Sequence, residues 1–276
     1  MESVFRPGLF LDQVLFITGG GSGIGLYTAR EFAYLGGKLF LVGRKLEKLT
    51  KAAAQLRQEH GVAQVEFASC DVREVDQVEK AVERCLDVYG RIDCLVNCAG
   101  GQFPAPAVDI SPKGWTAVIN TNLNGLFFMS QAVHKKAFVP QKSGRIVNVI
   151  ANMWNGFPLM AHTGAARAGV ENLTKTLGTE WGRVGVRVNA VAPGLIASSG
   201  LDTYDEGFKK ALQFARAFNQ AYRFGTEAEV AAAILFLLSP AASYITGTTL
   251  RIDAGESNYH PILPPIAHEN SSVWSG

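Results

Sequence analysis

The sequence predicts an α/β fold, a three-layer, doubly wound parallel sheet of about seven strands with helices on both faces. Three observations lead to this prediction. Short apolar runs alternate with segments of helical length almost from end to end, a glycine-rich run follows the first apolar run, and no repeat or low-complexity linker interrupts the pattern. Runs that are apolar throughout are typical of strands covered on both faces, as strands are in parallel sheets.

The predicted strands are continuously apolar and end at glycine or polar residues. In chain order they are Val14–Ile17, Leu39–Val42, Val65–Ala68, Cys94–Val96, Ile146–Ile150, Val186–Val191 and Thr248–Ile252. Segments of helical length lie between them, among them Leu26–Leu35, Leu46–Glu59, Val75–Tyr89 and Glu227–Leu238. Repeated strand–helix–strand units with right-handed crossovers place such strands in parallel.

One stretch, from Leu195 to Gly225, breaks the alternation. Its apolar residues recur at helical spacing: Phe208, Leu212, Ala215, Phe218 and Tyr222. Because α/β folds place substrate lids at the carboxyl ends of strands, we expect a small helical lid at about 195–225. Packing against the sheet or a contact between subunits would produce the same stripe. We expect residues 1–276 to form one domain with a core at about 8–257 and an extended, proline-containing tail at 258–276.

Composition excludes several classes of protein. The chain has 276 residues, 47% of them hydrophobic and 18% charged, with a formal net charge of +2. No basic footprint for nucleic acid is present, and no stretch approaches the ~20 apolar residues of a membrane span. The start lacks a basic and then apolar signal sequence, so we expect a cytoplasmic protein. The cysteines are expected to be reduced core thiols, not metal ligands: Cys70, Cys85, Cys94 and Cys98.

The glycine-rich run is Thr18-Gly19-Gly20-Gly21-Ser22-Gly23-Ile24-Gly25, directly after the first predicted strand and before a helix pattern. Glycine allows the backbone to approach a pyrophosphate closely, and a helix N-terminus presents N–H groups and a positive dipole end to it. This context predicts a Rossmann-like dinucleotide site. Its expected contacts are Gly19, Ser22, Gly23, Ile24 and Gly25.

The end of the second predicted strand indicates which dinucleotide binds. An acid about 20 residues after the glycines would bind the ribose of NAD. The sequence there is Val42-Gly43-Arg44-Lys45, and Arg44 follows Gly25 by 19 residues (44 − 25). A guanidinium suits a 2′-phosphate, so Arg44 and Lys45 predict NADP(H). The alternative is a surface arginine that begins a helix.

The glycine spacing resembles that of the short-chain dehydrogenase/reductase family, and the resemblance extends over nearly the whole chain. Further motifs of that family are Cys70-Asp71-Val72, Asn97-Cys98-Ala99-Gly100, Asn120-Thr121-Asn122-Leu123, Pro193-Gly194-Leu195-Ile196 and Ile245-Thr246-Gly247. The resemblance implies cofactor contacts at Asp71, Val72, Asn97, Ala99, Gly100, Pro193, Gly194 and Ile196, with Asp71 at the adenine and Asn97 as a scaffold residue. It places Asn122 at the family's catalytic-helix asparagine. It also implies a homo-oligomer, a dimer or tetramer.

The catalytic centre departs from the family pattern of Ser followed by Tyr-x-x-x-Lys. Arg167 stands in the Lys place and Thr163 in the Tyr place, while the Ser place falls at Ile150 or Ala151. A phenol of pKa about 10 beside an ammonium exchanges protons near neutral pH, whereas an aliphatic hydroxyl does not. Alcohol–ketone chemistry by the usual triad is therefore not expected.

Three segments resemble the peroxisomal-type trans-2-enoyl-CoA reductase branch, in which the Tyr-x-x-x-Lys pattern is also replaced. They are Gly100–Phe103, Ile110–Trp115 and His162–Val170. A tyrosine just after the Gly-Val pair is the proposed proton donor of that branch, and Glu171 occupies its position here. The resemblance implies an NADPH-dependent reduction of a 2-enoyl thioester such as an acyl-CoA.

Such a reduction sends hydride to the β-carbon and develops charge on the thioester oxygen, so a fixed donor or positive field is needed there. Arg167 is the expected source of the field, and it is also expected to bind the nicotinamide ribose. Packing, or an ion pair with Glu171, is the alternative role for Arg167. The candidate donors are His162, Thr163, Asn152 and Trp154, with His162 favoured because it also supplies a proton near neutrality.

Two other functions compete with this interpretation. One is an alcohol or carbonyl dehydrogenase with an atypical catalytic centre, and the other is a catalytically inactive nucleotide-binding homologue. The lid contains four basic residues, which either contact the phosphates of CoA or simply form a solvent-exposed helix face: Lys209, Lys210, Arg216 and Arg223.

Overall fold

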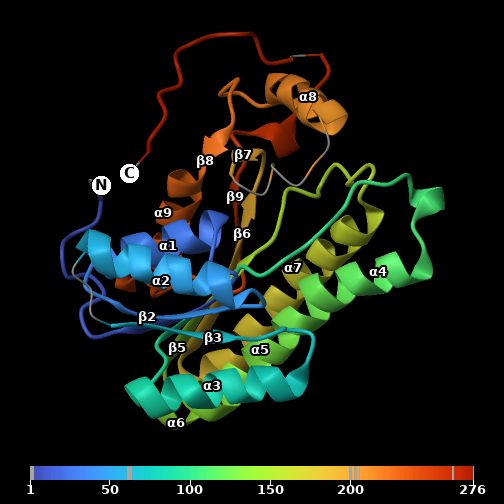
Figure 1. The fold of residues 1–276 in the computed structure, drawn as a ribbon. Coiled ribbons are helices and arrows are strands. Elements are labelled where there is room, and N and C mark those ends of the chain that lie inside the picture. Colours follow the sequence, from blue (N-terminus) through green and yellow to red (C-terminus); the bar gives the residue numbers. More distant parts are fainter. Residues whose placement is uncertain are drawn as a thin grey trace.

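The computed structural model describes residues 3–60, 64–198, 201, 204, 206–262 and 264–275. A seven-stranded parallel sheet with the order β3-β2-β1-β4-β5-β6-β9 forms its centre. Helices α1, α2 and α9 cover one face and α3, α5 and α7 the other (Figure 1). The predicted fold class is therefore confirmed.

The strands of this sheet lie within two residues of the predicted runs at each end. They are β1 (Val14–Thr18), β2 (Lys38–Gly43), β3 (Val65–Ser69), β4 (Cys94–Asn97), β5 (Gly144–Val149), β6 (Val186–Pro193) and β9 (Thr249–Ile252). The described helices are α1 (Gly23–Tyr34), α2 (Leu46–His60), α3 (Val75–Tyr89), α4 (Pro112–Ile119), α5 (Gly125–Val133), α6 (Val139–Gln141), α7 (Ala161–Trp181), α8 (Glu206–Ala215) and α9 (Glu227–Leu238). Helix α1 begins at Gly23 rather than at the predicted Leu26, because the glycine-rich turn leads directly into its first turn.

Alternate residues of the strands face the two helical layers. Ile17 and Leu41 pack with α1, α2 and α9, whereas Phe16 and Phe40 stack at 5.3 Å on the other face. All four side chains are fully buried. Burial on both faces explains why the sequence shows continuous apolar runs instead of alternation.

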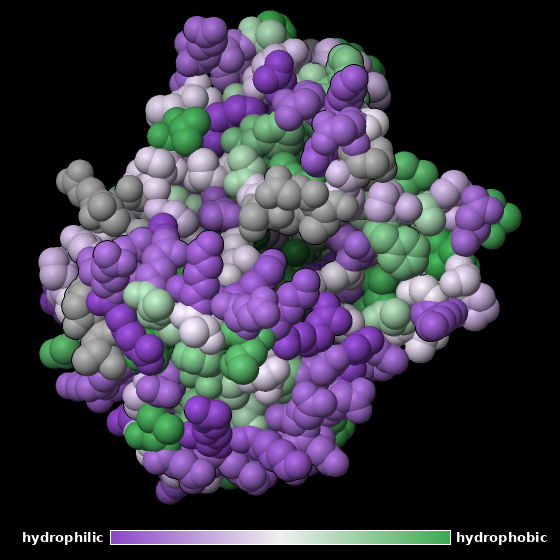
Figure 2. Space-filling view, viewed as in Figure 1, coloured by the Kyte–Doolittle hydropathy of each residue, from purple (hydrophilic) through white to green (hydrophobic). Residues whose placement is uncertain are grey.

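The strand order reverses between β1 and β4, which are neighbours in the middle of the sheet. In an open α/β sheet, the loops leaving two such strands separate to opposite faces and open a crevice at their carboxyl ends. Figure 2 shows a hollow between α1 and α7, above this edge of the sheet. The topology therefore places the candidate site at the ends of β1, β4, β5 and β6.

The segment expected to be a lid is partly helical. It contains α8 and a single turn of 3-10 helix, Arg216–Phe218, above a small separate sheet of β7 (Ile196–Ala197) and β8 (Gly225–Thr226) (Figure 1). The expectation that Tyr222 continues the helical stripe is wrong, since its φ of 54° lies in the left-handed region, beyond the helix end. The side chain of Phe208 lies outside the part of the chain that the structure describes.

The tail returns across the molecule toward α1 (Figure 1). Arg223 donates to Ser271 Oγ at 3.1 Å and to the Ser272 carbonyl at 3.0 Å, and Thr226 Oγ1 donates to the Trp274 carbonyl at 2.8 Å. The Tyr27 hydroxyl, on α1, donates to the carbonyl of Ser275. These bonds connect the lid base and α1 through the tail.

None of the helices in the described ranges combines the length and apolarity that crossing a bilayer requires. The four cysteines are free thiols, and three of them are buried, as the sequence predicted. Within the same ranges, no group of three or more His, Cys, Asp or Glu residues is arranged to hold a metal ion.

Candidate active site

The glycine-rich turn is packed too tightly for side chains at two positions. Gly19 has a φ of +72°, and a Cβ there would lie 3.0 Å from the backbone of Cys98 and Ala99. A Cβ on Gly25 would lie 2.4 Å from the Gly19 carbonyl oxygen. Thr18 Oγ1 accepts the N–H groups of Cys98 and Ala99, each at 3.1 Å, and so fixes the end of β4 against this turn. The backbone is thus open to close approach by a ligand.

The N-terminus of α1 lies at the same place. Ser22, its N-cap, makes no side-chain capping hydrogen bond, so the first N–H groups of the helix, which include those of Gly23 and Ile24, point outward without a cap. A cavity of about 710 Å³ opens there, and its lining includes Lys48 and Lys51 from α2 and, as the one acid, Glu227 at the start of α9. The uncapped N–H groups and two ammonium groups fit an anionic pyrophosphate.

Two guanidinium groups lie near the end of β2. Arg44 and Lys45 are exposed there, and Ser69 Oγ donates to the Arg44 carbonyl at 3.2 Å. Asp71 accepts two hydrogen bonds from Arg73 Nε, at 2.9 and 3.1 Å, and its Oδ2 forms an ion pair with Arg73 Nη2 at 2.5 Å. Arg73, and to a smaller extent Arg44, holds the pKa of Asp71 below its usual value. Because Asp71 neutralises Arg73 in this pair, Arg44 and Lys45 remain the predicted contacts of a 2′-phosphate.

Val72, next to Asp71, is buried, and a Cβ on Gly125 of α5 would clash with it at 2.6 Å. Asn97 donates to Ser130 Oγ and to Asn148 Oδ1, both at 2.9 Å. The Asn97 side chain is therefore used inside the fold, where it joins β4 to β5 and α5. These bonds agree with the scaffold role expected for Asn97, and its contact with a cofactor stays a prediction.

Asn122 holds the loop that follows β4. It lies in a π-helical segment, Asn120–Asn124, between α4 and α5. Its Nδ2 donates to the Gly101 carbonyl at 2.7 Å, and its Oδ1 accepts the Gly101 N–H at 3.2 Å. A Cβ on the preceding Gly100 would lie 2.9 Å from Asn122 Oδ1 and 2.6 Å from Arg167 Nη2. Asn122 and Arg167 therefore both lie against Gly100, and their shared role at the nicotinamide stays a prediction.

Arg167 is a buried cation, with 9% of its surface exposed. Nη1 donates to the Val149 carbonyl at 3.0 Å, and Nε has no partner among the described residues. Burial lowers the pKa of Arg167 to about 10, so the group stays charged at neutral pH. The alternative ion pair with Glu171 is not formed, because Glu171 pairs with Lys175 at 3.1 Å. The positive charge of Arg167 is therefore not neutralised by Glu171.

His162 and Thr163 begin α7 and are fully buried. The Thr163 N–H donates to His162 Nδ1 at 2.8 Å, so the neutral ring carries its proton on Nε2. Burial lowers the pKa of His162 and favours this neutral form. Nε2 is buried without a partner in the described structure, and the ring meets Phe103 edge-on with centroids 4.5 Å apart. His162 Nε2–H is thus a candidate hydrogen-bond donor, while burial, which lowers the pKa of the ring, acts against the predicted role of His162 as a proton source.

The carboxyl end of β6 forms the side of the candidate site opposite the loop after β4. The Gly194 N–H donates to the Ile252 carbonyl at 3.0 Å, Asn152 N–H donates to the Pro193 carbonyl at 3.0 Å, and Ile196 is buried in β7. The Arg251 guanidinium lies 3.9 Å from the centre of the Trp154 ring. The cation covers one face of the Trp154 ring and does not occupy its indole N–H, so Trp154 and Asn152 both remain candidate donors.

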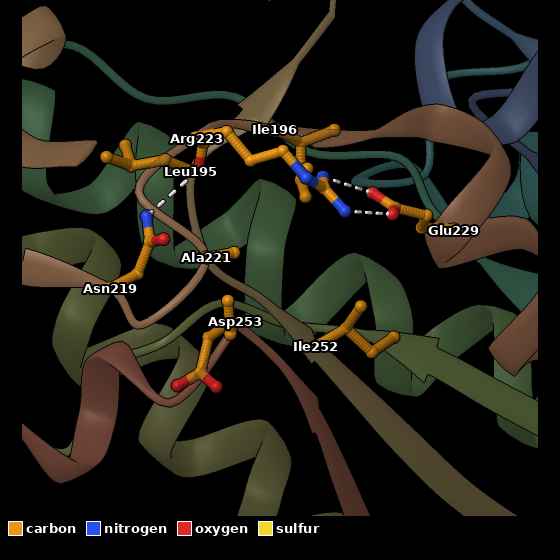
Figure 3. Close-up of a pocket in the computed structure, with 10 residues that line it drawn as sticks. Leu195, Ile196, Asn219, Ala221, Arg223, Glu229, Ile252 and Asp253 are labelled. Atoms are coloured by element: carbon orange, nitrogen blue, oxygen red, sulfur yellow. Dashed lines mark hydrogen bonds and ion pairs between the residues drawn. The ribbon is translucent and has the colours of Figure 1, made fainter. Parts of the chain in front are cut away.

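The lid contributes fewer available cations than the sequence suggested. Lys209 pairs with Glu206 at 2.8 Å, and Arg223 with Glu229 at 2.6 Å, while Lys210 and Arg216 are exposed. Figure 3 shows the Arg223–Glu229 pair at a cavity of about 230 Å³ between the lid base and the end of β9. Arg223 thus serves the structure of the lid.

The loop after β4 also touches the lid, since Gln102 Nε2 donates to the Tyr204 hydroxyl at 2.7 Å. Sequence reasoning missed this contact, because about one hundred residues separate the two side chains and no motif connects them.

Comparison with known proteins identifies the family. Residues 19–257 match the family model described as enoyl-(acyl carrier protein) reductase. A peroxisomal 2,4-dienoyl-CoA reductase [(3E)-enoyl-CoA-producing] of Mus musculus is 38% identical over 253 residues, 91% of this chain and 86% of that protein. A probable 2,4-dienoyl-CoA reductase [(2E)-enoyl-CoA-producing] of Bacillus subtilis (strain 168) is 38% identical over 248 residues, 88% of this chain and 96% of that protein.

Among solved structures, a citronellol catabolism dehydrogenase (AtuB) of Pseudomonas aeruginosa PAO1 is 47% identical, with a TM-score of 0.83 over 93% of this chain and 100% of its own. The two reductases are named for 2,4-dienoyl-CoA, so they do not single out the trans-2-enoyl-CoA branch that the motifs resemble. Family membership implies an NAD(P)(H) cofactor, which the glycine turn and the uncapped α1 N-terminus fit. The chain belongs to the short-chain dehydrogenase/reductase family.

Proposed function

We propose that this protein is an NADPH-dependent reductase of a C=C bond conjugated with the carbonyl of an acyl-CoA thioester. Both 2-enoyl and 2,4-dienoyl chains belong to this substrate class. The observation that carries the proposal is the pair of buried donors, Arg167 and His162, at the place where the family's phenol and ammonium are missing. The names of the relatives from mouse and B. subtilis support the same class.

The chain's own residues fit a bound NADPH, which supplies a hydride to the far carbon of the conjugated system. The glycine turn and the α1 N-terminus would hold the pyrophosphate. Arg44 and Lys45, both exposed at the end of β2, would hold the 2′-phosphate. Gly100 on one side and Pro193–Gly194 on the other would enclose the nicotinamide. Thr163, fully buried, would then shape the cleft without exchanging protons.

Addition of hydride moves negative charge onto the thioester oxygen. Arg167 lowers the energy of that charge through its field, and His162 Nε2–H is a fixed donor that needs no reorganisation. Burial lowers the pKa of His162 and disfavours its charged form, so we assign the proton that reaches carbon to solvent.

A dehydrogenase acting on an alcohol or carbonyl is the second candidate, favoured by the name of the P. aeruginosa structure. It requires a general base within the cleft. Thr163 has an aliphatic hydroxyl, and the one lone pair of His162, on Nδ1, already accepts a backbone N–H. This geometry favours the conjugated reduction.

A substrate panel tests the proposal. Purified protein with NADPH is offered 2-enoyl-CoA, 2,4-dienoyl-CoA, ketones and aldehydes, and with NADP⁺ it is offered alcohols, including citronellol. Absorbance of the reduced nicotinamide follows turnover. We expect turnover of one or both unsaturated thioesters alone. Turnover of alcohols or ketones alone selects the dehydrogenase, and binding of NADPH without any turnover selects the catalytically inactive homologue.

We also propose one domain with residues 195–225 as its lid, a dimer or tetramer, and a cytoplasmic location. An unpaired edge strand supports the oligomer: β9 has one neighbour in the described sheet, and Leu250 on it is 38% exposed. Light scattering coupled to size-exclusion chromatography measures the oligomer.

A further inference from the structure

The His162 ring, a donor in the proposed mechanism, is closed off from solvent. None of the surface of His162 is exposed, and Nε2 has no hydrogen-bond partner among the described residues. A buried donor without a partner is costly in a folded protein, which indicates that a partner reaches it during function. Because the ring is fully buried, a substrate atom can contact it only after a neighbouring group has moved.

Phe103, in the loop after β4, is a neighbour of His162 that faces solvent. The two rings meet edge to face, with centroids 4.5 Å apart and an interplanar angle of 71°. Phe103 keeps 37% of its surface exposed. One part of its ring therefore covers the imidazole while another part faces the outside of the molecule. A partly exposed side chain of this kind changes rotamer without disturbing the core.

A glycine in the first turn of α4 makes room for the Phe103 ring. A Cβ on Gly114 would lie 2.8 Å from Phe103 Cζ, a distance at which the ring would have to shift. The Gly114 N–H donates to Oγ of the N-cap residue Ser111 at 3.1 Å, and its φ is not positive. The backbone at Gly114 therefore does not require glycine, whereas the observed position of the Phe103 ring does.

Hydrogen bonds hold the loop backbone on both sides of Phe103. Before it, the Asn122 side chain bonds both the N–H and the carbonyl of Gly101. After it, the Ala105 N–H donates to the Leu159 carbonyl at 2.7 Å. Because the loop is held at both points, we expect the Phe103 ring to move by rotation about its own side-chain bonds.

We propose that Phe103 is a gate over His162: its ring must rotate away before the thioester can contact the imidazole. The closed position keeps water from the donor while no substrate is bound. The fraction of molecules in which the ring has moved limits the apparent affinity for the thioester, so Phe103 and Gly114 together set that affinity. The inference rests on the proposed function, because it is there that His162 contacts the thioester.

Chemical modification of His162 tests the gate without turnover. Diethyl pyrocarbonate carbethoxylates accessible imidazoles, and mass spectrometry of a digest measures the rate at each histidine, with the exposed His260 of the tail as internal standard. We expect Phe103→Ala to raise the rate at His162, relative to His260, about three- to tenfold, as loss of an edge-to-face ring contact implies.

Gly114→Ala should raise the rate at His162 by a smaller factor, because its Cβ displaces the Phe103 ring without removing it. The double variant should match Phe103→Ala, because Gly114 acts through that ring. Tyr244→Ala is the matched control, since Tyr244 is a fully exposed aromatic residue before the amino end of β9, at the opposite edge of the sheet. It should leave the rate at His162 unchanged, and circular dichroism confirms that each variant is folded.

Steady-state kinetics give a second measurement. With saturating NADPH and varied 2,4-dienoyl-CoA, KM of Phe103→Ala should fall about three- to tenfold at an unchanged kcat, because movement of the ring no longer opposes binding. A KM that is unchanged or raised overturns the gate. An unchanged modification rate at His162 in Phe103→Ala overturns it as well, even if the thioester is reduced. A raised modification rate without turnover of any thioester overturns only the proposed function.

Discussion

The exchange Arg167→Met tests the electrostatic part of the proposed mechanism, because methionine keeps an unbranched apolar side chain and removes the charge and the N–H groups. Loss of one fixed donor beside a developing oxyanion typically lowers kcat by about 10²–10³-fold, or about 2.7–4 kcal/mol. Arg167 supplies both a donor and a full charge from a site that is 9% exposed, where water screens it little. We therefore expect turnover of the unsaturated thioester to fall at least ~10²-fold.

The fold should tolerate this exchange. The charge-assisted hydrogen bond from Nη1 to the Val149 carbonyl contributes about 1.5–3 kcal/mol, and the desolvation costs of the unpaired Nε and the buried charge, which methionine removes, offset part of its loss. The assay is oxidation of NADPH at saturating thioester, with a thermal melt of each variant. Arg183→Met, at an exposed position in the 3-10 turn that follows α7, is the control and should match the unaltered protein. Nearly full turnover with a lowered Tm would show that Arg167 only packs, and would refute the reasoning.

Two further predictions concern the cofactor and the missing phenol. Arg44→Asp should weaken NADPH binding about ten- to hundredfold and leave NADH the tighter ligand, since a charge-assisted hydrogen bond contributes about 1.5–3 kcal/mol. Fluorescence titration measures both Kd values. Equal Kd values for NADPH and NADH in the unaltered protein would contradict the assignment of NADP(H). Thr163→Tyr combined with Arg167→Lys should not raise thioester reduction, and it should destabilise the fold by about 1–3 kcal/mol because Thr163 is fully buried. A large gain in ketone reduction by a well-folded double variant, with no thioester reduction by the unaltered protein, would favour the dehydrogenase.

The large features of the fold were predictable because their signals are local. Strands such as Val14–Thr18 and Val186–Pro193 are continuous apolar runs, and the dinucleotide turn combines a strand, glycines and a helix within about a dozen residues. Strands β7 and β8 were not predictable, because each has two residues and its partner lies far along the chain. Two-residue strands carry no periodicity.

Within the site, the sequence indicated which residues gather but not the state of each one. His162 was a candidate donor from its residue type, yet its tautomer and its lowered pKa depend on the Thr163 backbone and on burial. Such properties arise from packing, which a single sequence does not display.

The π-helical segment at Asn120–Asn124 has a consequence for helix phase. Asn122 at its centre contacts Gly101, and Ser130 in the following helix accepts a hydrogen bond from Asn97 on the strand before that loop. Eight positions of regular α-helix would rotate these residues about 80° apart. One α-turn of about 3.6 residues and one π-turn of about 4.4 residues together complete two full turns, so both side chains face the same strand. Removing one residue from this segment would keep the helix continuous but would rotate either Asn122 away from Gly101 or Ser130 away from Asn97.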